Sequence, residues 1–152
     1  MLRWLAHVTG ETSILAVLRD ARVLYLDVVA GSSPLRVCVE AGARAPAHAS
    51  ASGEARLAHR PEELPGVLRA RRKRITPVTV TRLAQLRRRL AEMRRSGLSL
   101  CRGERRPDIA SVAAPVFDGR AQCVAAVSLA GPATRFRDET LEEVERHVRK
   151  AS

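Results

Sequence analysis

The stretch IASVAAPVFDGRAQCVAAVSLAG, residues 109–131, decides the fold. Two runs of small and β-branched residues flank Asp118-Gly119 in its middle. Such a dipeptide between two apolar runs is a strong signal for a β-hairpin, because Gly tolerates the positive φ of a tight turn. Both runs are apolar at nearly every position, so we expect both faces of the hairpin to be covered.

Two hydroxyls interrupt this apolar pattern, those of Ser111 and Ser128. With a two-residue loop at 118–119, Ser111 lies opposite Ala126; with the loop at 119–120, Ser111 faces Ser128 directly. Either register places both serines on one face of the sheet, because side chains along a strand repeat with period two. The pair is either the floor of a small polar pocket or two core serines bonded to nearby backbone.

The composition indicates one globular domain. At 152 residues, with 45% hydrophobic and 28% charged residues, the chain is long and apolar enough to form one core without disulfides. Aromatic residues make up only 3%, which argues against a stacking surface for single-stranded nucleic acid. The net charge of +11 comes almost wholly from Arg, a bias that coding composition produces as readily as selection for an anionic partner.

Cysteine usage and hydropathy indicate the compartment. Cys38, Cys101 and Cys123 show no CxxC or zinc-like spacing, and an odd number of cysteines suits a reducing environment. No apolar run reaches the length of a membrane span, and the N-terminus lacks the pattern of a signal peptide. We therefore expect a cytoplasmic protein that contacts no membrane and holds no metal.

Alternation and turn signals predict an α+β fold with a mainly antiparallel sheet of about six strands flanked by helices. Strands at 13–19 and 22–30 are expected to pair across Asp20-Ala21, and a cleanly alternating run predicts a third strand at 35–40. The other expected elements are the tail of a helix at 1–9, helices at about 50–59, from Pro61, at about 79–95 ended by Gly97 and near 138–150, and a strand at 98–102.

The most basic run is RARRKR at residues 69–74. It is either a patch that contacts phosphate groups or a solvated helix end and loop. We favour the second interpretation, because no groove-reading motif adjoins the run.

The sequence contains no pattern typical of catalysis or cofactor binding. The four histidines lie far apart, and His48 with Ser50 lacks a carboxylate that would orient a nucleophile and base. The chain has no GxSxG, Walker or GxGxxG motif. We expect no enzyme activity, no catalytic residue and no cofactor.

Residues 42–58, GARAPAHASASGEARLA, resemble the segment GxxxPLHxTAxGKAxLA of the effector-binding domain of IclR-type bacterial transcription regulators. The resemblance covers roughly residues 8–150, and several motifs occur in the family's order. The further matching segments are Gly-Glu-Thr at 10–12, Thr-Pro-Val-Thr at 76–79, and the two hairpin strands at 109–117 and 125–132.

The resemblance implies a GAF-like domain that holds a small organic ligand, often a carboxylate, and that takes part in forming dimers and tetramers. Residues 1–10 would then be the remnant of a linker helix, and residues 11–152 the effector-binding domain. Six pocket positions carry over. The backbone amides of Ala51 and Ser52 would receive a carboxylate at a helix N-terminus. The others are Cys101, Ser111, Ser128 and Ala130.

Several of these positions depart from the family pattern. Cys101 stands where the family often has Asp, Ala130 where it often has a second Ser, and Ser111 where Cys is common. Glu54 replaces the Lys of the motif, and Arg56 replaces an apolar residue. Loss of an acid and a hydroxyl makes the pocket less polar, so we hypothesise an aromatic or branched acid as its ligand.

The winged helix-turn-helix domain of the family has no counterpart in this chain, which begins at what would be the linker. We therefore expect no sequence-specific DNA binding by this chain alone. The leading hypothesis is a sensor of a small organic acid that forms a homo-dimer or tetramer. The alternatives are a protein-interaction domain with a decayed pocket, which forms mixed oligomers with a full-length regulator, and a nonspecific nucleic-acid-binding basic domain.

Overall fold

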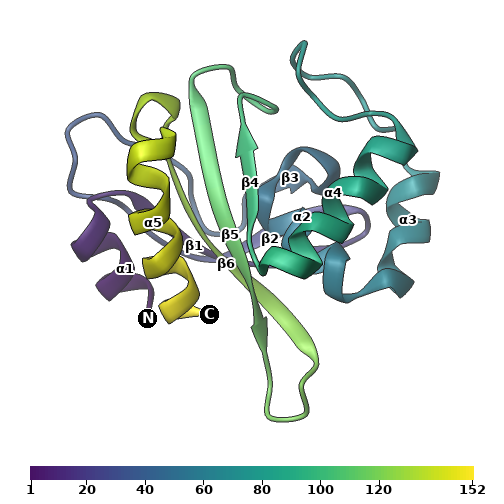
Figure 1. Ribbon diagram of the computed structural model, residues 1–152, viewed down its shortest axis with the longest axis horizontal. Coiled ribbons are helices and arrows are strands. Elements are labelled where there is room, and N and C mark those ends of the chain that lie inside the picture. The colour runs from purple at the N-terminus through teal and green to yellow at the C-terminus, as the bar shows by residue number, and fades with distance from the viewer.

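The computed structural model describes residues 1–137 and 142–152 in full and residues 138–141 by their backbone. The helices and strands follow one another along the chain in the order that the colours of Figure 1 show. The elements are α1 Leu2–Thr9, β1 Thr12–Arg19, β2 Arg22–Val29, β3 Arg44–Pro46, α2 Ala51–His59, α3 Leu64–Arg69, α4 Leu83–Ser96, β4 Ser99–Arg102, β5 Ile109–Phe117, β6 Cys123–Pro132 and α5 Asp138–Ala151, with short 3-10 turns at Ala47–Ala49, Pro61–Glu63 and Ala133–Arg135.

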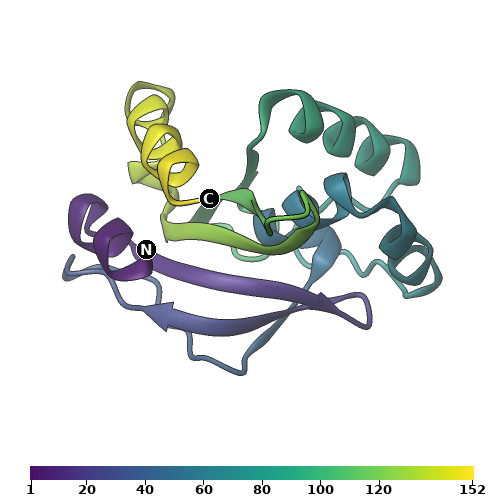
Figure 2. The ribbon, with the colours of Figure 1, turned by 90° about the horizontal axis from the view of Figure 1, so that it is seen from below.

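The six strands form one antiparallel sheet in the order β3-β2-β1-β6-β5-β4. This confirms the predicted α+β fold. Helices α2 and α4 pack on one side of the sheet, and α1 and α5 pack on the other (Figures 1 and 2). Along β5, Ala113 belongs to the first core, and its neighbours Val112 and Ala114 belong to the second. The central hairpin is therefore covered on both faces along most of its length, as its apolar sequence predicted, whereas Phe117 and Val124 near its tip are exposed.

Neither predicted register of this hairpin is correct. Pairing starts at Phe117 and Cys123, with a bulge beside Phe117, so the loop spans residues 118–122. The Asp118 carboxylate accepts hydrogen bonds of 2.9 Å from the N–H groups of Arg120 and Gln122, which favours this wider loop over a two-residue turn.

Ser111 consequently pairs with Ala130, and Ser128 pairs with Ala113. These four residues share one face, because cross-strand neighbours in an antiparallel sheet point to the same side. The prediction that Ser111 and Ser128 lie on one face is confirmed, although they are not direct partners.

The strand predicted at 35–40 is wrong. These residues form a loop, and the edge of the sheet is taken by β3 further along the chain. The loop is held by a hydrogen bond of 2.7 Å from Thr12 Oγ1 to the Val37 carbonyl, and Val37 and Val39 pack against the core. Alternating apolar residues suit any extended segment that lies on a core, with or without a strand partner. The alternation therefore predicted the extended conformation but not the lack of a partner strand.

The predicted helices are confirmed in the described parts, except for the start of the helix expected from residue 79. Helix α4 begins at Leu83, because the Thr79 hydroxyl is engaged in the preceding loop. It accepts from the Thr76 N–H at 2.8 Å and donates to the Glu104 carbonyl at 2.6 Å. Gly97, with φ of 78°, ends α4 as predicted.

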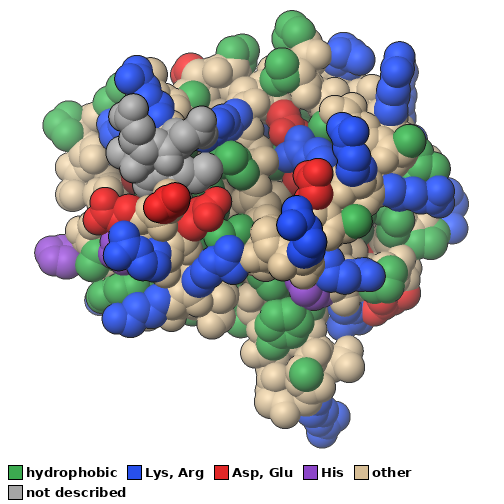
Figure 3. Space-filling model, viewed as in Figure 1, with side chains coloured by type: hydrophobic (Ala, Val, Ile, Leu, Met, Phe, Trp, Pro, Cys, Tyr) green, Lys and Arg blue, Asp and Glu red, His purple; other side chains and the backbone are tan. Residues whose placement is uncertain are grey.

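Charged side chains of both signs cover the surface, and Lys and Arg are most abundant over α3, α4 and the loop between them, on the right of Figure 3. None of the helices in the described part of the chain combines the length and apolarity needed to cross a bilayer.

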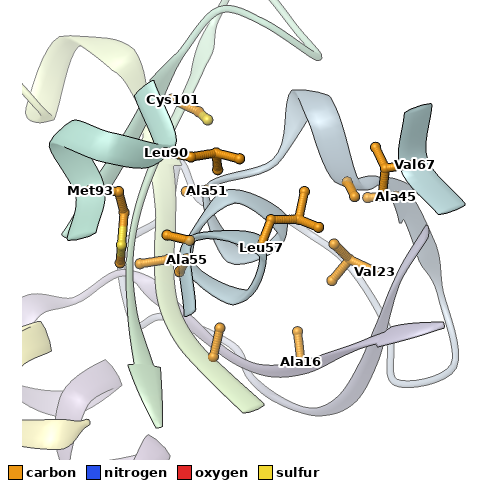
Figure 4. Close-up of a cluster of buried hydrophobic side chains, with 14 of the residues drawn as sticks. Ala16, Val23, Ala45, Ala51, Ala55, Leu57, Val67, Leu90, Met93 and Cys101 are labelled. Carbon is orange, nitrogen blue, oxygen red and sulfur yellow. The ribbon is translucent and has the colours of Figure 1, made fainter. Parts of the chain in front are cut away.

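The core around α2 is rich in alanine, and larger side chains such as Leu57 complete it (Figure 4). Ala51 and Ala55 of α2 are fully buried against the sheet, and Leu90 and Met93 of α4 close the outer side. Alanines permit a close approach of helix and sheet, because few side-chain atoms separate their backbones. This close approach brings the start of α2 to the strand residues described below.

Gly53 tests this packing, because a β-carbon there would overlap the backbone of Ala47. We expect Gly53→Ala to lower the free energy of unfolding by about 2 kcal/mol, the usual cost of overpacking. Urea titration measures the change. Gly66→Ala in α3 is the matched control, since a β-carbon at Gly66 meets no atom within 4 Å; it should leave stability unchanged or raise it by up to about 1 kcal/mol. Equal effects of both substitutions would contradict the packing argument.

Candidate functional site

A pocket of about 670 Å³ opens over the β5–β6 face that carries the serines. Its other walls are the start of α2, the loop at 35–39 and the turn at 104–109. The volume lies within the range typical of sites for small organic molecules. Segments far apart in the sequence therefore converge on one cavity.

Two hydroxyls meet at the inner end of the pocket. Ser52 Oγ, in the first turn of α2, donates a hydrogen bond of 3.0 Å to Ser128 Oγ on β6. Ser50 caps the same helix by accepting from the Gly53 N–H at 3.4 Å. The first N–H groups of a helix lack intrahelical partners and carry partial positive charge, so this corner of the pocket suits an anion.

Five of the six predicted pocket residues line the cavity, namely Ser52, Cys101, Ser111, Ser128 and Ala130. The sixth, Ala51, does not line it, since its side chain is buried in the core between α2 and the sheet. The part predicted for Ala51 concerned its backbone amide at the helix end, and whether any of the six contacts a ligand stays a prediction.

Other lining residues were not predicted as part of the site. Arg105 Nη1 donates a hydrogen bond of 2.9 Å to the Tyr25 hydroxyl, and both side chains line the pocket. The sequence assigned Tyr25 only to a predicted strand, and it gave Arg105 no role. The loop at 35–39, which was assigned to the sheet, is a wall of the cavity. No local motif marks such residues, because only the tertiary fold brings them together.

A buried ionic cluster lies behind the pocket wall. Arg89 of α4 donates to Glu54 Oε2 at 3.0 Å, to the Leu100 carbonyl at 2.8 Å and to Glu104 Oε1. Ser99 Oγ adds a hydrogen bond of 2.7 Å to Glu54 Oε2. Burial raises the pKa of the Glu54 carboxyl from 4.5 to about 7, and outweighs the Arg89 guanidinium, which favours the charged form.

Glu54, Glu104 and Cys101 are the one group of described residues whose ligand atoms lie close enough to hold a metal, within 4.8 Å of one another. The Arg89 guanidinium already donates to all three, at 3.4 Å to Cys101 Sγ. Burial also raises the pKa of the Cys101 thiol well above its usual value, so the sulfur is a neutral thiol. The Arg89 guanidinium therefore occupies this group of ligand atoms and supplies the positive charge that a metal ion would otherwise bring.

The possible nucleophile and base at His48 and Ser50 are engaged elsewhere. His48 Nε2 donates to the Lys73 carbonyl at 3.1 Å, and Ser50 caps α2. The geometry of these two residues provides no activated nucleophile.

Comparisons with known proteins identify the domain. A family model described as "Bacterial transcriptional regulator IclR C-terminal" matches residues 1–152. The chain is 37% identical to the HTH-type transcriptional regulator BhcR of Paracoccus denitrificans, over 100% of this chain and 55% of that protein. It is 32% identical to the transcriptional repressor IclR of Escherichia coli, over 100% of this chain and 57% of that protein. The chain thus spans about half the length of these curated relatives.

Solved structures of IclR-family regulators have the same fold as this chain. The Thermotoga maritima IclR structure has a TM-score of 0.90 and 31% identity, covering 98% of this chain and 61% of that one. The C-terminal domain of the E. coli transcriptional regulator KdgR has a TM-score of 0.87 and 27% identity, covering 99% of this chain and 88% of that one.

The raised pKa of the Glu54 carboxyl predicts that the stability of the domain depends on pH. A carboxyl whose pKa rises from 4.5 in the unfolded chain to about 7 in the folded one binds its proton more tightly when folded. Its contribution to stability is therefore complete below about pH 4.5 and is lost as the pH rises to about 7, by an amount on the order of 3 kcal/mol.

Glu54→Gln should remove this contribution. We expect the difference in unfolding free energy between the original chain and the variant to change steadily between about pH 4.5 and 7, as measured by urea titration at each pH. Glu40→Gln, at an exposed carboxylate, is the control and should show only a small change. Parallel curves for the original chain and Glu54→Gln would contradict the assignment.

Proposed function

Because the chain belongs to the IclR family of bacterial transcriptional regulators and matches their C-terminal, effector-binding and oligomerisation domain, we propose that it binds a small organic acid in the pocket over β5 and β6. The observation that carries this proposal is the contact between Ser52 and Ser128 at the start of α2. A carboxylate placed there would accept from helix N–H groups and from both hydroxyls. Binding would report the acid to the rest of a regulator.

Two arginines favour an anionic ligand. Arg36 and Arg105 line the pocket, and within the described residues neither pairs with a carboxylate. Their field attracts acids toward the cavity.

The size of the pocket favours a larger acid. A two- or three-carbon acid would leave most of about 670 Å³ to water, and Ile14, Val37 and Val39 add apolar surface to the walls. An aromatic or branched acid would bury this surface, with a gain of about 25 cal/mol per Å².

Two departures from the family pattern do not fill the cavity. Glu54 pairs with Arg89, Arg56 donates to Glu63 at 2.9 Å, and neither Glu54 nor Arg56 lines the pocket. This disfavours the alternative of a decayed pocket. That alternative, an interaction domain forming mixed oligomers with a full-length regulator, predicts no response to any acid.

A thermal-shift screen against aliphatic, branched and aromatic acids tests the proposal. A bound acid at a hundredfold excess over its Kd stabilises the native state by about 2.7 kcal/mol, which corresponds to a rise in Tm of about 5 °C or more. Ser128→Leu should abolish the rise, because the larger side chain fills the pocket and breaks the bond to Ser52. Ser13→Ala, which removes a buried hydroxyl bonded to the Leu2 carbonyl outside the pocket, should keep it. Binding of two- or three-carbon acids alone would contradict the preference for larger acids, and an unchanged response in Ser128→Leu would contradict the site.

Oligomer formation is the second part of the proposal. We expect the purified chain to run as a dimer or tetramer, since family members form oligomers and this domain contributes to them. Size-exclusion chromatography with light scattering measures the mass directly. A monomer at micromolar concentration would contradict this part and leave the acid site standing.

A further inference from the structure

The positive charge of the chain is concentrated in one segment. Residues 69–95 contain eleven of the 27 basic residues and one of the 16 acidic residues, so they carry +10 of the total +11. A coding bias toward Arg would raise its content along the whole chain without separating it from the acids. The remainder of the chain is almost neutral, so composition alone does not explain this segment.

Ten of these residues form a surface that we call the basic face. They lie at the end of α3, in the loop that follows and on α4 (Figure 3). All are exposed except Arg72, which is half-buried. The members are Arg69, Arg71, Arg72, Lys73, Arg74, Arg82, Arg87, Arg88, Arg94 and Arg95.

The charges of the basic face are not neutralised by neighbouring acids. Some arginines elsewhere do pair with acids, as Arg56 does with Glu63 and Arg135 with Glu11. Among the described residues, no member of the basic face lies within ion-pair distance of a carboxylate. Ten unpaired like charges repel one another, and an anionic partner would relieve that repulsion.

Helix α4 arranges part of this charge in a row. Its Leu86, Leu90 and Met93 are buried, which turns the opposite side outward. Arg87, Arg88 and Arg95 share that outer side, since they fall within about 100° around the helix. A helix of 14 residues is about 21 Å long, and duplex DNA presents a phosphate charge about every 1.7 Å along its axis.

The chemistry of the face selects among polyanions. Arginine guanidinium groups bind phosphate and carboxylate groups alike in bidentate geometry. The row of arginines on α4 favours the regularly spaced phosphates of a duplex. All four aromatic residues of the chain lie outside 69–95, which excludes the base stacking that single strands require. We infer that the basic face binds the phosphate backbone of duplex DNA without sequence preference. This inference concerns a surface outside the acid pocket and does not depend on it.

Fluorescence anisotropy of the purified chain with a labelled mixed-sequence duplex tests the inference. We expect binding at about 50 mM salt that weakens steeply by about 200 mM, with each phosphate contact adding about −0.9 to the slope of log K against log salt. Arg87→Glu, Arg88→Glu and Arg95→Glu together should reduce the slope by about 2.7 and the affinity by about a hundredfold or more near 0.1 M salt.

The matched control changes the same net charge elsewhere. Arg3→Glu, Arg120→Glu and Arg146→Glu alter three exposed arginines outside the basic face and should cost far less affinity. Equal losses in the two triple variants would show an effect of net charge alone and overturn the inference. So would equal binding of polyglutamate at matched charge, or failure of the original chain to bind DNA at low salt.

Two checks separate this result from misfolding and from the acid site. Circular dichroism establishes whether each variant is folded. If the charge-reversed variant is not folded, the triple variant Arg87→Gln, Arg88→Gln and Arg95→Gln replaces it, and this variant should lose the same three phosphate contacts. The thermal response to acids should be kept in the folded variant, because the basic face is outside the pocket.

Discussion

The hydrogen bonds of the Arg89 guanidinium hold the architecture around the pocket together. They join Glu54 on α2, the Leu100 carbonyl on β4 and Glu104 in the pocket wall to helix α4. Isolated charges at these depths would be strongly unfavourable, so each member requires the others. The proton that Glu54 retains near neutrality offsets the second carboxylate. The position of α2 over the sheet is thus determined by charge balance as well as by apolar burial.

The small side chains of α2 and of the central strands explain how a polar contact survives in this core. Ala51, Ala55 and Ala113 separate helix and sheet by little more than backbone, and this brings the Ser52 and Ser128 hydroxyls within 3.0 Å. Bulkier residues would increase the spacing and leave both hydroxyls without a partner. Close packing and the polar corner of the pocket therefore have the same structural cause.

Local patterns in the sequence predicted the elements far better than their pairing. The hairpin, the helix capped by Ser50 and the stop at Gly97 depend on neighbouring residues, and all were predictable. The hairpin register depended on two side-chain hydrogen bonds of Asp118, which apolar periodicity does not contain. The motif resemblance predicted five lining residues. The contacts of Arg89 with Glu54 and Glu104 connect residues far apart in sequence, for which a single chain carries no covariation signal.

The loop over the pocket has a consequence for the rate at which a ligand enters and leaves. In the described structure, residues 34–39 make no backbone–backbone hydrogen bond, and the loop is held through contacts such as that of Thr12 with the Val37 carbonyl. Displacing it leaves every strand pair of the sheet intact. Local openings of this kind require less free energy than global unfolding. A ligand that enters from this side would exchange through loop opening, without unfolding of the domain.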